Sequence, residues 1–204
     1  MLYMKKIVFL LLLICPILPV WSQTNIKFNG ATFGTTPEIF ISGFPEKPSI
    51  KAFTNRNIFT PDVCNGYEGN IKLNSERWNC YFLSSRKSDK VFRTVCNRHS
   101  YQMQNDLMLL VKTLEDKYGG HREEKQEDLG KIYHSYTDYS GHQEMLALYY
   151  TIRNSNNQAI GEIRISCAPS DKEAKTGYIE LSYTDFNTQK IAQNEYNSIM
   201  YNAL

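Results

Sequence analysis

The sequence predicts an α+β protein in which two tandem units of one helix and four strands form an antiparallel sheet, with the helices on one face and a further helix at the C-terminus. Three observations predict it: an apolar stripe with helical spacing in mid-chain, alternating apolar and polar runs on both sides of it, and an order of helix then four strands that occurs twice. Strands that follow one another along the chain favour antiparallel pairing. One continuous sheet of about eight strands is the simplest arrangement, and two separate small domains are the alternative.

Residues 1–22 have the pattern of a cleavable secretory signal peptide. Lys5 and Lys6 form a short positive region, and an almost purely apolar run over 7–19 follows them. A membrane-spanning helix needs about 20 residues, and this run is shorter. We therefore expect cleavage before Gln23 and a protein that works outside the cytoplasm, in the periplasm, at the cell surface or in the medium.

Removal of this leader leaves a chain without net charge. The full sequence has 23 basic and 21 acidic residues, and only Lys5 and Lys6 leave with the leader. A near-neutral protein lacks the electrostatic footprint of a nucleic-acid or anionic-membrane binder, so neither partner is expected. No second long apolar run follows, so we expect no transmembrane span in the mature chain. Lipidation at Cys15 is the alternative to cleavage, but Ile14 is larger than the residue that usually precedes a lipidated cysteine.

The first unit is expected over residues 23–99. Thr36-Pro37-Glu38 combine an N-cap, a proline at the first helical position and an acid in the first turn, which predicts a short helix. Short strands are expected over 49–53 and 69–73, with a loop over 55–65 between them.

The same unit continues with a hairpin that contains two cysteines. Strands over 77–85 and 91–97 flank a polar turn, and counting outward from Ser88 at its centre places Cys80 opposite Cys96. Directly opposed residues of antiparallel strands lie close enough for a disulfide, and an oxidising compartment preserves it. We predict a Cys80–Cys96 bridge. Two buried free thiols are the alternative, since cysteine also packs well as a small apolar side chain. The cysteine count alone permits several disulfide pairings.

The strongest local signal is a helix over 101–118, which opens the second unit, residues 100–204. Ser100 is expected as its N-cap and Gly119-Gly120 as its end. The acidic run over 123–128 is interpreted as a solvated linker. The apolar stripe of the helix consists of Met103, Leu107, Leu110, Val111, Leu114 and Tyr118.

The remainder of the second unit reads as strands. Alternation predicts them over 131–137, 145–153, 159–167 and 177–184. A weaker helical pattern over 187–202 predicts the C-terminal helix.

Three segments together resemble a group of small exported proteins of unknown function from Gram-negative gut bacteria. They are 28–35 (FNGATFGT), 114–119 (LEDKYG) and 179–187 (IELSYTDFN). The group begins with a phrase like F-x-G-I-P-x-x-G-T, carries L-x-x-K-Y-G-x-P at the end of the helix and finishes with Y-x-D-x-x-N. This chain departs from the group at Ala31-Thr32 and at Gly120-His121. The architecture also resembles β-lactamase inhibitor proteins and small outer-membrane assembly lipoproteins, a likeness of fold that transfers no function.

A catalytic or metal site would have to be built from the histidines. His121 and His142 each stand in a Gly-His-x-Glu sequence, and two such loops could bring imidazoles and carboxylates to one metal ion. Both lie among turn residues, and His134 alternates with strand residues. Cys96 and His99, three apart on one strand, face opposite sides. We predict no catalytic residue, no metal ligand and no cofactor; an extracytoplasmic hydrolase with a loop-histidine site is the alternative.

The sheet face away from the helices is the candidate for binding. Alternation places Tyr149, Arg164, Tyr178 and Glu180 on this face, and Tyr81 has the same role in the first unit. Tyrosines among charges give contact area at low entropic cost, as recognition surfaces require. We predict a monomer that binds a protein, a glycan or an envelope component through this open face. An ordinary solvated face and a structural envelope protein are the alternatives.

Overall fold

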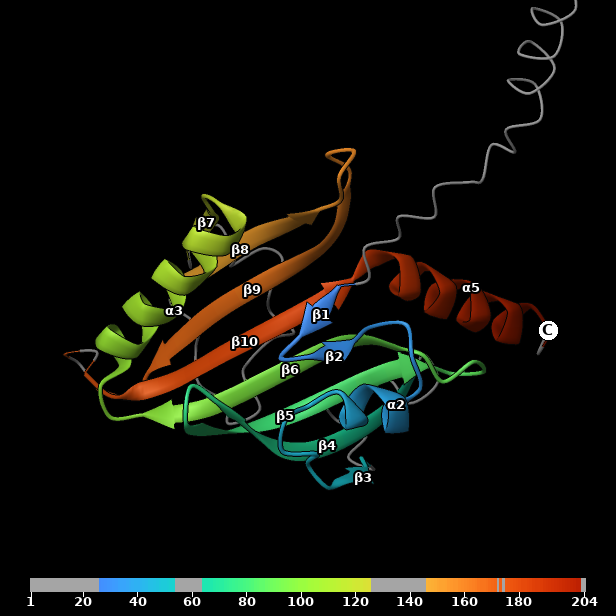
Figure 1. The fold of residues 1–204 in the computed structure, drawn as a ribbon, viewed down its shortest axis with the longest axis horizontal. Helices are drawn as coiled ribbons and strands as arrows, with labels where there is room; N and C mark the ends of the chain where they lie inside the picture. Colours follow the sequence, from blue (N-terminus) through green and yellow to red (C-terminus); the bar gives the residue numbers. More distant parts are fainter. Residues whose placement is uncertain (1–25, 54–63, 126–145, 172, 174, 203–204) are drawn as a thin grey trace, which may run out of the picture.

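A computed structural model describes residues 26–53, 64–125, 146–171, 173 and 175–202 (Figure 1). The predicted leader, the predicted strand over 131–137, His134 and His142 lie outside these residues. Within them, no helix is both long enough and apolar enough to cross a membrane. The elements are β1 (Lys27–Phe28), β2 (Ala31–Thr32), α2 (Pro37–Ser42), β3 (Ile50–Ala52), β4 (Cys64–Leu73), β5 (Glu76–Ser85), β6 (Val91–Ser100), α3 (Met103–Tyr118), β7 (Arg122–Lys125), β8 (Leu146–Arg153), β9 (Ala159–Pro169), β10 (Gly177–Asp185) and α5 (Phe186–Asn202).

Eight strands form one continuous sheet in the order β3-β4-β5-β6-β10-β9-β8-β7, and every neighbouring pair is antiparallel. The predicted α+β class and the continuous sheet are thus confirmed. Helix α2 precedes β3 to β6, and helix α3 precedes β7 to β10. The two sets run in mirrored order, so that the last strands of both, β6 and β10, pair at the centre of the sheet (Figure 1). The tandem-repeat interpretation stays a prediction, because the residues of the two sets do not visibly repeat.

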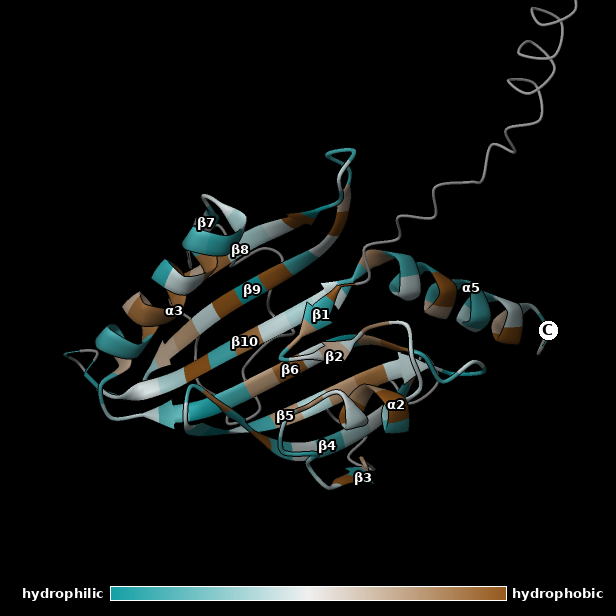
Figure 2. Cartoon of the chain, viewed as in Figure 1, coloured by the Kyte–Doolittle hydropathy of each residue, from teal (hydrophilic) through white to brown (hydrophobic). Residues whose placement is uncertain are grey.

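Helices α2 and α3 pack against the same face of the sheet, which we call the helix-covered face. Phe40 of α2 meets the Phe82 ring of β5 at a centroid distance of 5.8 Å. The Tyr150 hydroxyl of β8 donates to the Val111 carbonyl of α3 (3.5 Å). Side chains of both sets join in one buried cluster, and Figure 2 shows apolar and polar residues alternating along β9 and β10. Alternate residues of β9 and β10 belong to this cluster: Ile163, Ile165, Cys167, Ile179, Leu181 and Tyr183.

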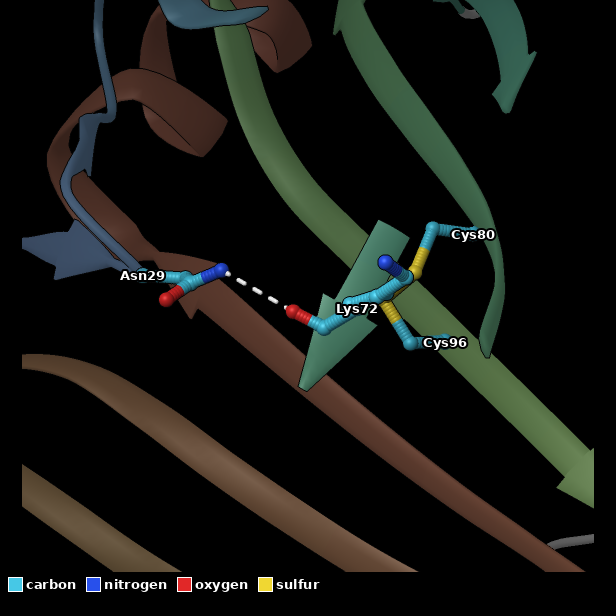
Figure 3. The surroundings of a disulfide bond; sticks show 4 residues. All are labelled: Asn29, Lys72, Cys80 and Cys96. Carbon is cyan, nitrogen blue, oxygen red and sulfur yellow. Dashed lines mark hydrogen bonds between the residues drawn. A yellow bond between two sulfur atoms is a disulfide. The ribbon is translucent and has the colours of Figure 1, made fainter. Parts of the chain in front are cut away.

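The predicted disulfide is confirmed. Cys80 of β5 and Cys96 of β6 stand directly opposite one another and are joined through their sulfur atoms. Both residues are buried in the main core (Figure 3). Figure 3 also shows the hydrogen bond that the Asn29 side-chain amide donates to the Lys72 carbonyl (3.4 Å), which ties the N-terminal turn to β4.

The N-terminal hairpin β1–β2 was not expected from the sequence. Asn29 and Gly30 form its turn with φ values of 48° and 91°, the left-handed geometry that a two-residue hairpin turn requires. A Cβ atom at Gly30 would lie 2.5 Å from the Gly43 carbonyl oxygen, so glycine also permits close contact with the end of α2.

The predicted end of α3 at Gly119 is confirmed, but the predicted N-cap and the predicted linker after the helix are wrong. Ser100 is the last residue of β6, and the helix begins at Met103. The Ser100 hydroxyl accepts a hydrogen bond from the Gln102 N–H (3.1 Å), in the turn before the helix. After the helix, Arg122–Lys125 forms edge strand β7 against β8 instead of a linker. Strand pairing uses backbone groups, and charged residues are common on sheet edges, where they discourage further pairing.

Helix α5 lies on the other side of the sheet from α2 and α3. Its Ala192 packs with Cys64, Leu83 and Phe92 in a cluster separate from the main core. Because Leu83 follows the core-facing Phe82 in β5, its side chain points to the opposite face.

Candidate functional site

The five predicted binding residues lie on one face of the sheet, the face opposite α2 and α3, which we call the second face. A single row of directly opposed residues crosses all eight strands on this face. Tyr81, Arg164 and Tyr149 belong to this row, and Glu180 and Tyr178 follow at the next alternate positions of β10. The row consists of Lys51, Glu68, Tyr81, Val95, Ser182, Arg164, Tyr149 and Arg122.

The part of this face on β8, β9 and β10 holds a buried polar network. The Arg164 guanidinium donates to the Tyr149 hydroxyl (3.3 Å), to the Ser166 hydroxyl (3.0 Å) and to the Glu180 carboxylate (3.2 Å). Arg122 adds its guanidinium above the Tyr149 ring, 4.4 Å from the centroid. A buried guanidinium needs such a partner set, because an unpaired charge away from water is very unfavourable.

The prediction of an open face is wrong at Tyr149 and Arg164. Tyr149 is 6% exposed and Arg164 is 7% exposed. Both side chains are engaged in the network, so they give the sheet internal order and present little surface to a ligand. Replacing Tyr149 with alanine would therefore disturb the fold, so such a variant could not report on binding alone.

Tyr178 lies at one end of the second face in an aromatic group. Its ring is 5.0 Å from the His99 ring, which in turn is 4.9 Å from Tyr101. The His99 Nε2 atom and the Ser170 hydroxyl oxygen are 3.4 Å apart. Tyr178 is half-buried, and Tyr101 is exposed.

Tyr81 borders a hollow on the other half of the face, between β3, β4 and β5. The hollow has a volume of about 370 Å³, and its polar side chains come from Ser49, Lys51, Glu68, Asn70, Asn79 and Tyr81. We call it the Tyr81 hollow. Of the five predicted residues, only Tyr81 lines it. The Phe53 ring supports the Tyr81 ring in an edge contact at 5.2 Å.

In the hollow, the two charged side chains form an ion pair between β3 and β4, and two asparagines face one another on β4 and β5. The Lys51 ammonium donates to the Glu68 carboxylate (2.7 Å), and this contact raises the pKa of Lys51. Burial and the nearby Glu68 carboxylate raise the pKa of the Tyr81 phenol, which therefore stays neutral at physiological pH. Asn70 and Asn79 are directly opposed and exposed, so their amides stand side by side at the surface.

No sequence motif singled out the other polar residues of the hollow, among them Lys51, Glu68, Asn70 and Asn79. Alternation along β4 and β5 could have placed Glu68 and Asn70 on the same face as Tyr81. The hollow lies where β3 pairs with β4 over only three residues. The sequence predicted a strand over 49–53, and β3 lies within it, but it did not indicate how few of these residues would pair with β4.

The described histidines do not converge on one site. His99 lies on the second face, beside Tyr178. His121 lies on the helix-covered side, with its Nδ1 atom 2.9 Å from the Glu115 carboxylate and its ring 5.5 Å from that of Tyr150. Cys96 is bound in the disulfide and supplies no thiolate nucleophile. Among the described residues, no three or more His, Cys, Asp or Glu side chains are grouped in a way that could hold a metal ion.

Comparison of the chain with models of protein families, with curated proteins and with solved structures finds no match.

Proposed function

We propose that the chain is an exported binding module that takes its partner in the Tyr81 hollow. The observation that carries this proposal is the position of Tyr81. It belongs to the predicted binding set, and it lines a hollow on the sheet face that α2 and α3 leave uncovered. Concave sites with a few convergent polar groups are the usual form of ligand sites.

Three features support a site on this half of the face. The polar side chains around the hollow are half-buried or exposed, whereas Tyr149 and Arg164 are buried. The disulfide between β5 and β6 lies next to the hollow, since Cys80 contributes to its lining, and it holds β5 in place. Export follows from the predicted leader, and a disulfide is the kind of bond that persists outside the cytoplasm.

In the part of the chain that the structure describes, no observation favours the hydrolase alternative. His99 and His121 are separated by the sheet, and a general base must lie within hydrogen-bonding reach of the group from which it takes a proton. A structural envelope protein without a small ligand is the other alternative, and the experiment below separates it from a binding module.

Comparative capture tests the proposal. The exported protein is immobilised and exposed to envelope extract and culture fluid, and bound material is identified by mass spectrometry. Asn79→Arg fills the hollow from an exposed position, so we expect it to lose the partner that the wild type captures. Asn156→Arg in the exposed β8–β9 turn is the matched control and should capture it normally.

Thermal melting of both variants shows that each is folded. A partner that binds Asn79→Arg as well as the wild type would place the binding surface elsewhere. Capture of nothing by the wild type would argue against a binding module and for a structural role.

A further inference from the structure

We infer that the ligand of the Tyr81 hollow is a neutral saccharide, bound with the face of a sugar ring against the Tyr81 side chain. This inference rests on the proposed function and names the ligand class for the same site.

The charge of the hollow favours a neutral ligand. Its two charged residues, Lys51 and Glu68, form an ion pair at 2.7 Å, so together they contribute no net charge. A phosphate or sulfate group that approached Lys51 would meet the Glu68 carboxylate, and a cation that approached Glu68 would meet the Lys51 ammonium. Either ion would be repelled by the like charge of the pair, which lowers its affinity for the hollow.

The polarity of the hollow favours a ligand with many hydroxyl groups. The amides of Asn70 and Asn79 each offer two donors and an acceptor, and they are opposed on neighbouring strands. The Ser49 and Tyr81 hydroxyls add groups that both donate and accept. An apolar ligand would strip water from these groups without replacing its hydrogen bonds, which costs free energy. Vicinal hydroxyls of a sugar can replace the water, since each also donates and accepts.

The aromatic ring supplies the apolar part of the contact. Tyr81 is half-buried, lines the hollow and contacts the Phe53 ring, so it brings aromatic surface to the hollow at small entropic cost. The C–H groups on one face of a pyranose ring form a matching apolar surface. A volume of about 370 Å³ lies at the low end of small-molecule sites, which suits a short stretch of a glycan.

Titration with defined oligosaccharides tests the inference. The exported protein is titrated calorimetrically with hexamers of α-1,4-glucose, β-1,4-glucose, β-1,4-mannose and N-acetylglucosamine, and with a sulfated glycan and a mixed peptide pool. We expect at least one neutral hexamer to bind, with an affinity that 0.5 M NaCl leaves almost unchanged, because screening acts only on charged contacts.

Variants locate the bound sugar. Tyr81→Phe keeps the ring and should stay within about threefold of the wild type, whereas Tyr81→Ala should weaken binding about tenfold. The double variant Asn70→Ala/Asn79→Ala should weaken it about tenfold or more, because two amides lose their hydrogen bonds. Tyr178→Ala is the matched control, a tyrosine of the same face outside the hollow, and should bind normally.

Three results would overturn the inference: no neutral hexamer binds, only the sulfated glycan or peptides bind, or Tyr81→Ala binds as well as the wild type. These results are distinct from failure of the proposed function. If capture from extracts depends on Asn79 while no saccharide binds, the hollow is a binding site for another ligand class.

Discussion

At the scale of single residues, the Cys80–Cys96 bridge closes a loop across the β5–β6 hairpin, with a sequence separation of 16 residues. A disulfide that closes a loop of about 15 residues stabilises a protein by about 3 kcal/mol, chiefly by restricting the unfolded chain. Both cysteines are buried, so alanine is the suitable replacement, because it places no polar group in the core.

We predict that Cys80→Ala/Cys96→Ala lowers the free energy of unfolding by about 3 kcal/mol, measured by urea denaturation of the oxidised protein. The wild type treated with dithiothreitol should lose a similar amount, whereas the double variant should not respond to it. Equal stability of the oxidised wild type and the double variant would show that the bridge is not formed in solution.

Residue positions on the sheet were largely predictable, but residue exposure was not. Counting outward from Ser88 opposes Cys80 and Cys96, and the pairs from Cys80–Cys96 to Leu83–Arg93 follow that register. A bulge after Leu83 shifts the pairing next to the turn, which counting did not reveal. Alternation likewise identified the face of Tyr149 and Arg164. It could not show that both are buried, because burial depends on contacts between segments far apart in the sequence.

At the scale of elements, helix α5 is fixed to the β5–β6 hairpin through Glu195. The Glu195 carboxylate accepts hydrogen bonds from the Lys87 N–H (2.8 Å) and the Ser88 N–H (3.2 Å). Partial burial acts to raise the pKa of Glu195, but the hydrogen bonds from Ser88, Lys87 and Ser85 outweigh it and hold the pKa below its usual value. A carboxyl group with a lowered folded-state pKa stabilises the fold above its ordinary pKa, and this contribution is lost as the pH falls through the folded-state value.

We predict that Glu195→Ala lowers stability by about 1–2 kcal/mol at neutral pH and speeds hydrogen exchange in α5 more than in β9. Asn194→Ala, at the neighbouring exposed position, is the control and should leave exchange unchanged. The difference between Glu195→Ala and the wild type should shrink as the pH drops below the usual carboxyl range. A difference independent of pH would show that the carboxylate does not hold the helix.

Elements with strong local periodicity were predictable, and elements without it were not. The apolar stripe of α3 and the hairpin β5–β6 follow from spacing alone. The Asn29-Gly30 turn carried a hairpin signal, but β1 and β2 are two residues each, too short for alternation to show. The charged sequence of β7 is typical of a linker, so it did not indicate a strand. An edge strand can carry such charges because it pairs through its backbone.

At the scale of the whole molecule, the two sets of four strands share one core. Strands β6 and β10 pair over eight residues, from Arg93 to Ser100 on β6. The main cluster contains Phe40 and Phe82 from the first set together with Tyr150 and Ile163 from the second. Because both sets bury their apolar face against the same layer, we expect the whole sheet to unfold in one cooperative transition.

Trp78 allows this cooperativity to be measured. The sequence has two tryptophans, Trp21 in the predicted leader and Trp78 in β5, so the fluorescence of the exported protein reports on the first set alone. Ile163→Val removes one buried methyl group from β9 in the second set and should cost about 1 kcal/mol. In a single cooperative unit, the urea midpoint of Trp78 fluorescence should fall by as much as that of far-ultraviolet circular dichroism.

Thr151→Ala, exposed on β8, should shift neither curve by a comparable amount. If Ile163→Val left the Trp78 midpoint unchanged while the dichroism curve moved or split, the two sets would unfold independently, and the second face would not act as one rigid surface.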